Sequence, residues 1–275
     1  VRETSLDAKG APMMTRKGYA TKSTRYDGRG AVFTESFLDA NGGPTFGSEG
    51  WSERRYSRDA QGREVSVRTV DTLGNLVADE HGVAQVQTTR SAALTKTRKL
   101  GTDGQLRGTA GGVAGRDVTR DPHGRVVKVT SVDVTGLPIR DPATGCATFE
   151  TVYDPWGAVR LERCRDPQGQ LALGDQGWAV RAYTSDALGR VVSVERLDTS
   201  KQPVVGHGGW SKEVRAYSDR GWLSRRVFLD TEEGQVGAAT VISRDVRGRV
   251  VREQSLSPTD EPMMNTEGWS TKRLD

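Results

Sequence analysis

Short runs rich in β-branched residues recur along this chain, as in segments 65–71, 126–133 and 191–198. Such side chains favour extended strands, and each run is too short to form a stable helix. No segment places apolar residues at three- and four-residue spacing over a helical length. The pattern therefore predicts an all-β protein built from short strands.

Two series of Asp-x-x-Gly turns separate these runs. The first series lies at 6–10, 38–42, 70–74, 132–136 and 165–169, and it decays at 197–201 and 229–234. The second follows at 26–30, 58–62, 120–124, 153–157, 185–189 and 244–248. Asp accepts hydrogen bonds from a turn backbone, and Gly tolerates a positive φ, so each motif predicts a tight hairpin connection.

A Gly followed by an apolar residue marks each copy of a longer repeat. The markers are Gly18-Tyr19, Gly50-Trp51, Gly82-Val83, Gly112-Val113, Gly145-Cys146, Gly177-Trp178, Gly209-Trp210, Gly237-Ala238 and Gly268-Trp269. Successive markers are 32, 32, 30, 33, 32, 32, 28 and 31 residues apart. Each unit is expected to contain a strand, a tight turn, a longer strand that includes the marker, and another tight turn.

Residues 1–275 are accordingly interpreted as a single repeat array with two degenerate copies. Near 91–104 the first Asp-x-x-Gly is lost, and near 230–248 a loop or a strand is shortened. Both faces of the expected strands mix apolar and charged residues, whereas a sandwich strand has one clean apolar face. We therefore expect an elongated sheet, able to coil into a spiral, of eight to nine tandem β-hairpin repeats stabilised by their neighbours. The chain begins with Val1, and we expect it to be a fragment of a longer array.

Composition narrows the possible partners. Hydrophobic residues make up 34% of the chain and aromatic residues 6%, and the net charge is only +4. Basic and acidic residues alternate, whereas a nucleic-acid-binding surface concentrates basic residues in a stripe, so nucleic-acid binding is disfavoured. No apolar run reaches the roughly 18 residues needed to span a membrane.

The turn motifs resemble a known family. SDALGRVVSV (185–194), RDPHGRVVKV (120–129), RDAQGREVSV (58–67) and YDGRGAVF (26–33) resemble the tyrosine-aspartate (YD) repeats of bacterial Rhs-type proteins. The period of about 32 residues is longer than is usual in that family, and the Tyr remains only as Tyr26 and Tyr153. The resemblance implies a long β-sheet array, extracellular or on the cell surface, that wraps a toxic cargo or displays a binding surface. A cytoplasmic location is the alternative.

The tryptophans are the candidate binding residues. Trp51, Trp178, Trp210 and Trp269 recur at the marker position, where each can pack against the next hairpin. The alternative is a ladder of flat platforms for a sugar polymer or an extended peptide. Trp156 and Trp222 lie in or beside turns, where an indole has less to pack against, so they are better binding candidates unless they fold back over the sheet.

The two cysteines flank the turn at 153–157. If Tyr153 pairs with Ala158, then Cys146 and Cys164 lie opposite each other or one step apart across the hairpin. The hypothesis is a cross-strand disulfide in an oxidising compartment, and the alternative is two reduced thiols.

No motif indicates catalysis, a cofactor or a metal. His81, His123 and His207 neighbour glycines without a nucleophile or a metal-ligand spacing, and the recurring Asp residues are explained by turn capping. We expect a non-enzymatic scaffold that recognises a protein partner along its surface. The alternatives are a carbohydrate-binding array and a shell or spacer of a larger toxin- or effector-carrying protein. The sequence leaves the oligomeric state open.

Overall fold

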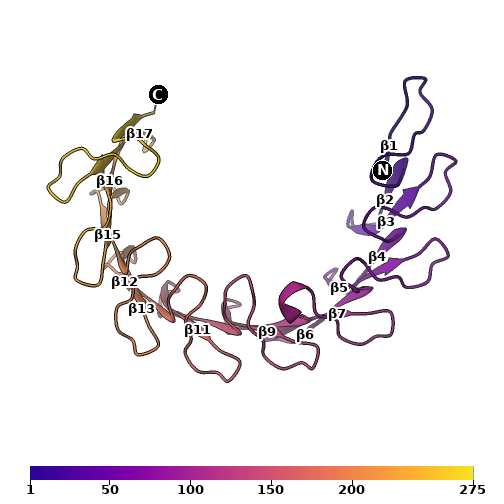
Figure 1. Ribbon diagram of the computed structural model, residues 1–275, viewed down its shortest axis with the longest axis horizontal. Helices are drawn as coiled ribbons and strands as arrows, with labels where there is room; N and C mark the ends of the chain where they lie inside the picture. Colours follow the sequence, from indigo (N-terminus) through magenta and orange to yellow (C-terminus); the bar gives the residue numbers. More distant parts are fainter. Residues whose placement is uncertain (275) are drawn as a thin grey trace. The chain divides into compact units, whose positions relative to one another are not determined.

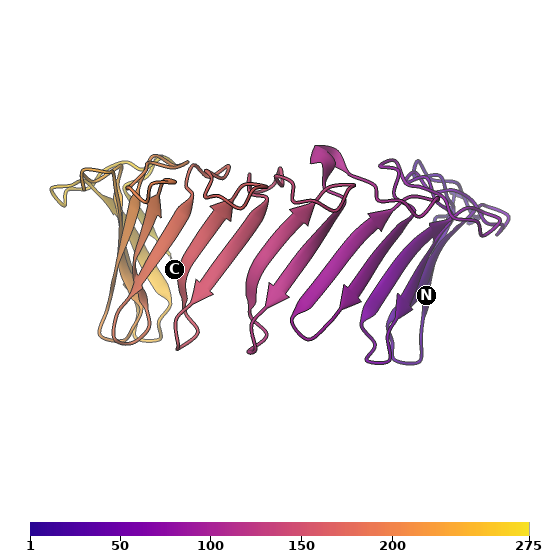
Figure 2. The same cartoon turned by 90° about the horizontal axis from the view of Figure 1, so that it is seen from below.

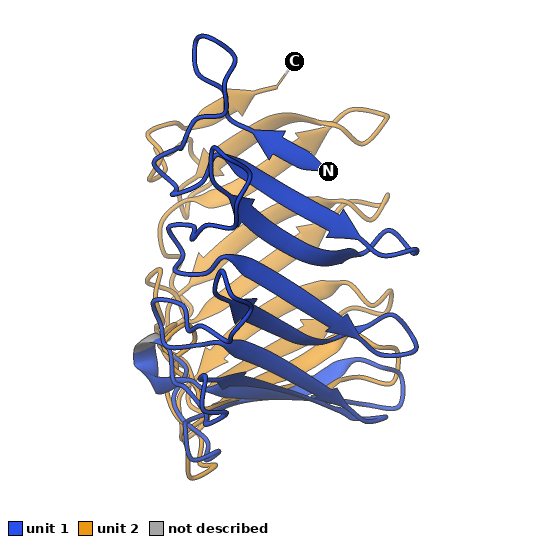
Figure 3. Cartoon of the chain, turned by 90° about the vertical axis from the view of Figure 1, so that its right-hand side faces the viewer, with its two compact units in different colours: residues 1–141 blue, residues 142–275 orange. Residues whose placement is uncertain are grey.

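The structure is a computed structural model that describes residues 1–274, the side chain of Ala110 excepted. It divides into two compact units, Val1–Asp141 and Pro142–Asp275, which are coloured separately in Figure 3. The interpretation of the chain as one repeat array stays a prediction. The same hairpin repeat is found in each unit (Figure 1).

Each unit is a series of antiparallel hairpins. The strands of the first unit are β1 (Arg2–Thr4), β2 (Thr21–Tyr26), β3 (Val32–Leu38), β4 (Glu53–Arg58), β5 (Glu64–Val70), β6 (Gln85–Arg90), β7 (Leu94–Leu100), β8 (Gly115–Arg120) and β9 (Val126–Val132), with a 3-10 turn η1 at Ala110–Gly112. Those of the second unit are β10 (Thr148–Tyr153), β11 (Val159–Arg165), β12 (Val180–Ser185), β13 (Val191–Leu197), β14 (Lys212–Tyr217), β15 (Leu223–Leu229), β16 (Ala239–Arg244), β17 (Val250–Leu256) and β18 (Thr271–Arg273). The predicted all-β array of tandem hairpins is confirmed.

The Asp-x-x-Gly motif builds the turn within each hairpin. Between β2 and β3, the Asp27 N–H donates to the Ala31 carbonyl at 2.9 Å, and Gly30 has a φ of 79°. Asp27 Oδ1 accepts the N–H groups of Ala31 and Arg29, each at 2.9 Å. These bonds, with Ala31 first, lower the pKa of the Asp27 carboxyl, so the capping group is a carboxylate at neutral pH. Within each unit, turns of this kind follow one another at one edge of the strands, and the longer connections lie at the other edge (Figure 2).

The prediction that the marker lies within a longer strand is wrong. The marker Gly closes a third tight turn: the Thr15 N–H donates to the Tyr19 carbonyl at 2.9 Å, and Gly18 has a φ of 83°. The first turn also closes on itself, because Leu6 and Pro12 form an isolated bridge. Each regular unit therefore carries two consecutive small turns between one hairpin and the next.

Turns that lose the motif in sequence keep its geometry. In the decayed copies Lys201 and Glu233 stand in the place of Gly, and both adopt a φ of 63°. Near 91–104, Gly101 replaces the expected Asp, yet its N–H still donates to the Gln105 carbonyl at 2.8 Å. The larger change in that copy is a shortened hairpin turn, closed by a 2.8 Å bond from the Ser91 N–H to the Leu94 carbonyl.

A small residue follows the marker, and in the complete copies it is hydrogen-bonded to neighbouring hairpins. The Ser52 N–H donates to the Val70 carbonyl of its own hairpin, and its carbonyl accepts the Phe37 N–H of the preceding hairpin, each at 2.9 Å. The counterparts are also Ala or Ser: Ala20, Ala84, Ala114, Ala147, Ala179, Ser211, Ala238 and Ser270. Small side chains allow the turn to lie directly against both strands.

The turn of β2–β3 offers a matched pair of substitutions. An added Cβ meets nothing within 4 Å at either Gly28 or Gly30, but only Gly30 has a positive φ. We expect Gly30→Ala to lower the free energy of unfolding by about 1 kcal/mol. Gly28→Ala is expected to raise it by about 0.4–1 kcal/mol, because Ala restricts the unfolded chain. Urea unfolding of both variants checks this, and equal effects would contradict the assigned turn geometry.

Candidate functional site

Marker side chains pack over one recurring strand position, which we call the column position. In the first unit Phe37 occupies that position, and its ring lies 4.4 Å from the rings of both Tyr19 and Trp51. Phe37 is 4% exposed and Trp51 is 2% exposed. The faces of these rings are therefore buried between consecutive hairpins and are not free to bind a ligand.

Trp178 is buried in the same way. It is 4% exposed, Arg181 lies 4.5 Å from the centre of its ring, and Phe149 approaches it edge-on at 6.1 Å. Because Trp51 and Trp178 present no free face, the tryptophans do not form a continuous ladder of exposed platforms.

Cys146 occupies a marker position and is joined by a disulfide to Cys164 at the column position, with Cα atoms 5.2 Å apart. The register predicted for the pair is wrong, because Phe149 is the residue opposite Cys164. Cys146 precedes β10 and lies in the third turn, which folds over the sheet. The bond thus connects a turn to the strand beneath it and does not cross the ladder of one hairpin.

The column is interrupted between β15 and β16. The Val236 N–H donates to Phe228 as the Val204 N–H donates to Arg196, so Val236 corresponds to Val204. The pairing of Ala239 with Leu256 matches that of Lys212 with Leu229. Gly237 therefore stands at the place of the marker Trp210, and the five residues 205–209 have no counterpart.

The shortening predicted near 230–248 thus lies in the loop, because β15 and β16 keep the usual seven and six residues. The sequence pattern took Ala238 as the apolar marker residue of this copy, but the register places Gly237 at that position. A glycine therefore stands where other copies have a side chain. Only two register pairs join β15 to β16, whereas three join β13 to β14.

A groove of about 920 Å³ lies at this interruption. Phe228 holds the column position and is half-buried, because it has Trp210 on one side at 5.1 Å and no marker side chain on the other. Trp269 is also half-buried, and Met263 and Met264 are exposed. The lining is Gly208, Trp210, Leu223, Arg226, Phe228, Val236, Gly237, Ala238, Thr240, Ile242, Glu253, Met263, Met264, Asn265, Thr266, Glu267, Trp269 and Lys272.

Polar groups at the groove differ from those of a complete turn. Trp51 and Trp269 donate their indole N–H to Glu49 at 3.0 Å and Glu267 at 2.9 Å, respectively. Gly208 stands at the corresponding place in the turn of Trp210, so that turn supplies no carboxylate to its own indole. Arg226 lies 5.2 Å from the centre of the Phe228 ring and is exposed.

Trp210 is supported from below by a buried arginine. Arg196 lies 3.3 Å from the centre of the Trp210 ring and donates from Nη1 to the His207 carbonyl at 2.7 Å. Burial and the neighbouring Arg181 lower the pKa of Arg196 to about 10, so it remains charged at neutral pH. This support fixes the Trp210 ring as one wall of the groove.

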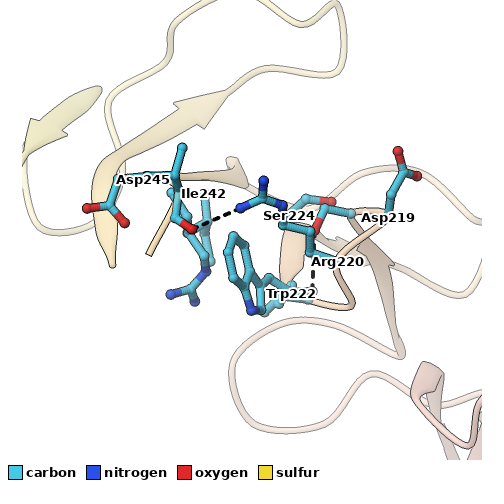
Figure 4. Close-up of a pocket in the computed structure, with 10 residues that line it drawn as sticks. Asp219, Arg220, Trp222, Ser224, Ile242 and Asp245 are labelled. Carbon is cyan, nitrogen blue, oxygen red and sulfur yellow. Dashed lines mark hydrogen bonds between the residues drawn. The ribbon is translucent and has the colours of Figure 1, made fainter. Parts of the chain in front are cut away.

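The groove continues to the hairpin turn of Trp222, because Leu223 and Ile242 also line an adjacent hollow of about 410 Å³ (Figure 4). Arg220 Nη1 donates to the Val246 carbonyl at 2.9 Å and crosses the end of this hollow. Trp222 is half-buried against the backbone at Gly248. It therefore folds back onto the neighbouring turn while one side lines the hollow.

Trp156 lies apart from the groove. It is 93% exposed and lines a separate hollow with Leu188, another exposed turn residue. Of the six candidate tryptophans, the structure brings Trp210, Trp222 and Trp269 to the groove and its extension, and Trp156, Trp51 and Trp178 lie elsewhere.

Within residues 1–274, no group of three or more His, Cys, Asp or Glu side chains is arranged to hold a metal ion. In the same residues, no helix is long and apolar enough to cross a membrane.

Comparisons with known proteins identify no family. No family model matches the chain, and no curated protein does. Among solved structures, a TcdB2-TccC3-TEV crystal structure is 13% identical over 92% of this chain and 14% of that one, with a TM-score of 0.29. A structure of the Photorhabdus luminescens Tc holotoxin pore is 11% identical, and the match covers 91% of this chain and 15% of that one, with a TM-score of 0.26. A porin-like protein from Bacteroides uniformis is 10% identical, and the match covers 86% of this chain and 87% of that one, with a TM-score of 0.23. The chain spans about a seventh of the length of the first two.

Sequence reasoning missed the groove and the roles of Phe228, Met263 and Met264. The interval of 28 residues was the available signal, because it showed that one copy had lost part of a loop. It did not show which turn was lost, since the third turn itself had been assigned to a strand.

The disulfide gives a direct test of the second unit. The bond closes a loop with a sequence separation of 18 residues, and Cys164→Ser is expected to lower the free energy of unfolding by about 3 kcal/mol. Wild-type protein under reducing conditions should show the same loss, whereas the variant should be insensitive to reductant. Equal stability of oxidised and reduced wild type would contradict a structural role for the bond.

Proposed function

We propose that this chain is a non-enzymatic β-repeat scaffold that recognises a protein partner through the groove over β15–β17. The observation that carries the proposal is the loss of one turn from an otherwise regular column. That loss leaves Phe228, Trp210 and Trp269 half-buried around a single hollow.

The lining suits a protein segment. Aromatic residues and methionine are enriched at the centres of protein interfaces, and methionine adapts its shape to different apolar partners. Met263 and Met264 line the groove together with Phe228, and the exposed Arg226 adds a charge. Carbohydrate binding is less well supported, because two of the four marker tryptophans are buried.

We place the protein outside the cell or on its surface. The Cys146–Cys164 disulfide supports this location, since such bonds persist in oxidising compartments and are rare in the cytosol.

Selection from a displayed peptide library tests partner recognition. A filled variant, in which a copy of residues 205–210 replaces Gly237, restores the turn and serves as the counter-selection target. We expect peptides that bind the wild type and fail to bind the filled variant. Recovery of no binders, or of binders that ignore the insertion, would contradict recognition through this groove.

A further inference from the structure

We infer that the occupant of the groove is a tight turn of a protein partner, carrying an aromatic residue with an acidic residue two positions before it. Such a turn would complete the interrupted column between Phe228 and Trp269. This inference rests on the proposed function and specifies the chemistry of the partner.

The repeat itself shows what the groove accommodates. At Phe37 the column position is covered on both sides, and the ring of Trp51 lies at 4.4 Å. Phe228 has the same place in its hairpin but only one covering ring. A second aromatic ring, brought in on a turn like that of Trp51, would continue the packing between hairpins that the rest of the fold already uses.

The short connection between β15 and β16, residues 230–238, is held against the sheet by hydrogen bonds of its own. Gln235 Nε2 donates to the Gly237 carbonyl at 2.9 Å and to the Leu256 carbonyl at 3.1 Å. In a complete copy, the backbone N–H of the small residue makes the corresponding bond to the end of the second strand, as Ser211 does to Leu229. The glutamine side chain therefore replaces a backbone contact and keeps the connection against the sheet, where it does not cover Phe228.

The charges favour an acid beside the aromatic residue. In the complete turn, Glu49 accepts from the Trp51 indole at 3.0 Å and from Arg54 Nη2 at 3.2 Å. The groove offers one similar donor, the exposed guanidinium of Arg226. Arg226 lies opposite Thr240, which stands where Arg54 stands in the complete copy. Arg226 forms no ion pair within residues 1–274.

The two carboxylates that line the groove leave Arg226 available. Glu267 is bound to the indole of Trp269, and Glu253 lies opposite Lys272 in the register of β17 and β18. Neither carboxylate is on the hairpin that carries Arg226. A partner carboxylate placed as Glu49 is placed would therefore face Arg226 without competition from either of them.

The probe is a cyclised, dye-labelled peptide with the sequence of Phe46–Ser52. It contains the complete turn of this same chain and leaves out Arg54, which binds Glu49 in the intact protein. Fluorescence anisotropy measures its binding to the wild-type protein. We expect saturable binding that weakens about tenfold or more when the peptide carries Trp51→Ala, because that change removes the ring that would be buried. Equal binding of the two peptides would overturn the inference.

The charge is tested on both sides of the contact. Arg226→Glu should weaken binding of the parent peptide several-fold and leave binding of the peptide with Glu49→Gln nearly unchanged. A loss that is the same for both peptides would overturn the pairing with Arg226, since it would not depend on the carboxylate.

Two variants locate the site. The filled variant should abolish binding, and Met264→Glu, at an exposed wall position, should weaken it even if the filled variant fails to fold. Trp156→Ala is the matched control, because it removes an exposed aromatic from a separate hollow, and it should bind as the wild type does. Loss of binding in the control with retention in Met264→Glu would overturn the assignment to the groove.

The result separates this inference from the proposed function. Library selection could yield groove-dependent peptides without an aromatic residue while the turn peptide fails to bind. That outcome would support recognition of a protein through the groove and would overturn the inference that the occupant is an aromatic turn. If neither the library nor the turn peptide yields groove-dependent binding, both fall.

Discussion

The structure depends on the contact that each third turn makes with the two hairpins beside it. A small residue such as Ser52 is hydrogen-bonded to both hairpins, and the marker side chain before it covers the column position. A single two-stranded hairpin is marginal in water, so stability must come from such links between neighbours. With 34% hydrophobic residues, the chain buries the side chains of this column, the small residues beneath it and a few strand residues such as Val70 and Val132.

The column tolerates several chemistries because it requires only that a side chain fill the space above the strand. Stacked rings fill it at Tyr19, Phe37 and Trp51, a disulfide at Cys146 and Cys164, and an arginine under an indole at Arg196 and Trp210. The variety explains why neighbouring copies differ so much in sequence and keep the same backbone. It also makes the copy at Gly237 distinctive, since there the requirement is not met by the chain itself.

Hairpin turns were predictable because their chemistry is local. The carboxylate of Asp27 and the positive φ of Gly30 specify one turn geometry, and those two positions recur in the sequence. The third turn was not predictable on these grounds: Thr15 and Gly47 open it in different copies, so only its final glycine recurs. The wrong register of the cysteines has the same cause. The sequence pattern assigned Cys146 to a strand, whereas it lies in the third turn, over the strand that carries Cys164.

The candidate site was only partly visible in the sequence for a related reason. Trp210, Trp222 and Trp269 could be named from their types, but their exposure depends on what covers them. Phe37 and Phe228 are the same residue at the same repeat position, and one is buried while the other is half-buried. The difference arises from a neighbouring loop, which is a tertiary effect that periodicity alone does not encode.

The most direct test of this account is the stability of the filled variant. Replacing Gly237 by a copy of residues 205–210 places an indole over Phe228 at the cost of a slightly longer loop. We expect the free energy of unfolding, measured by urea denaturation, to rise by about 1–2 kcal/mol above that of the wild type. A fall in stability, with the hairpins still formed, would contradict the claim that the column is interrupted at this position.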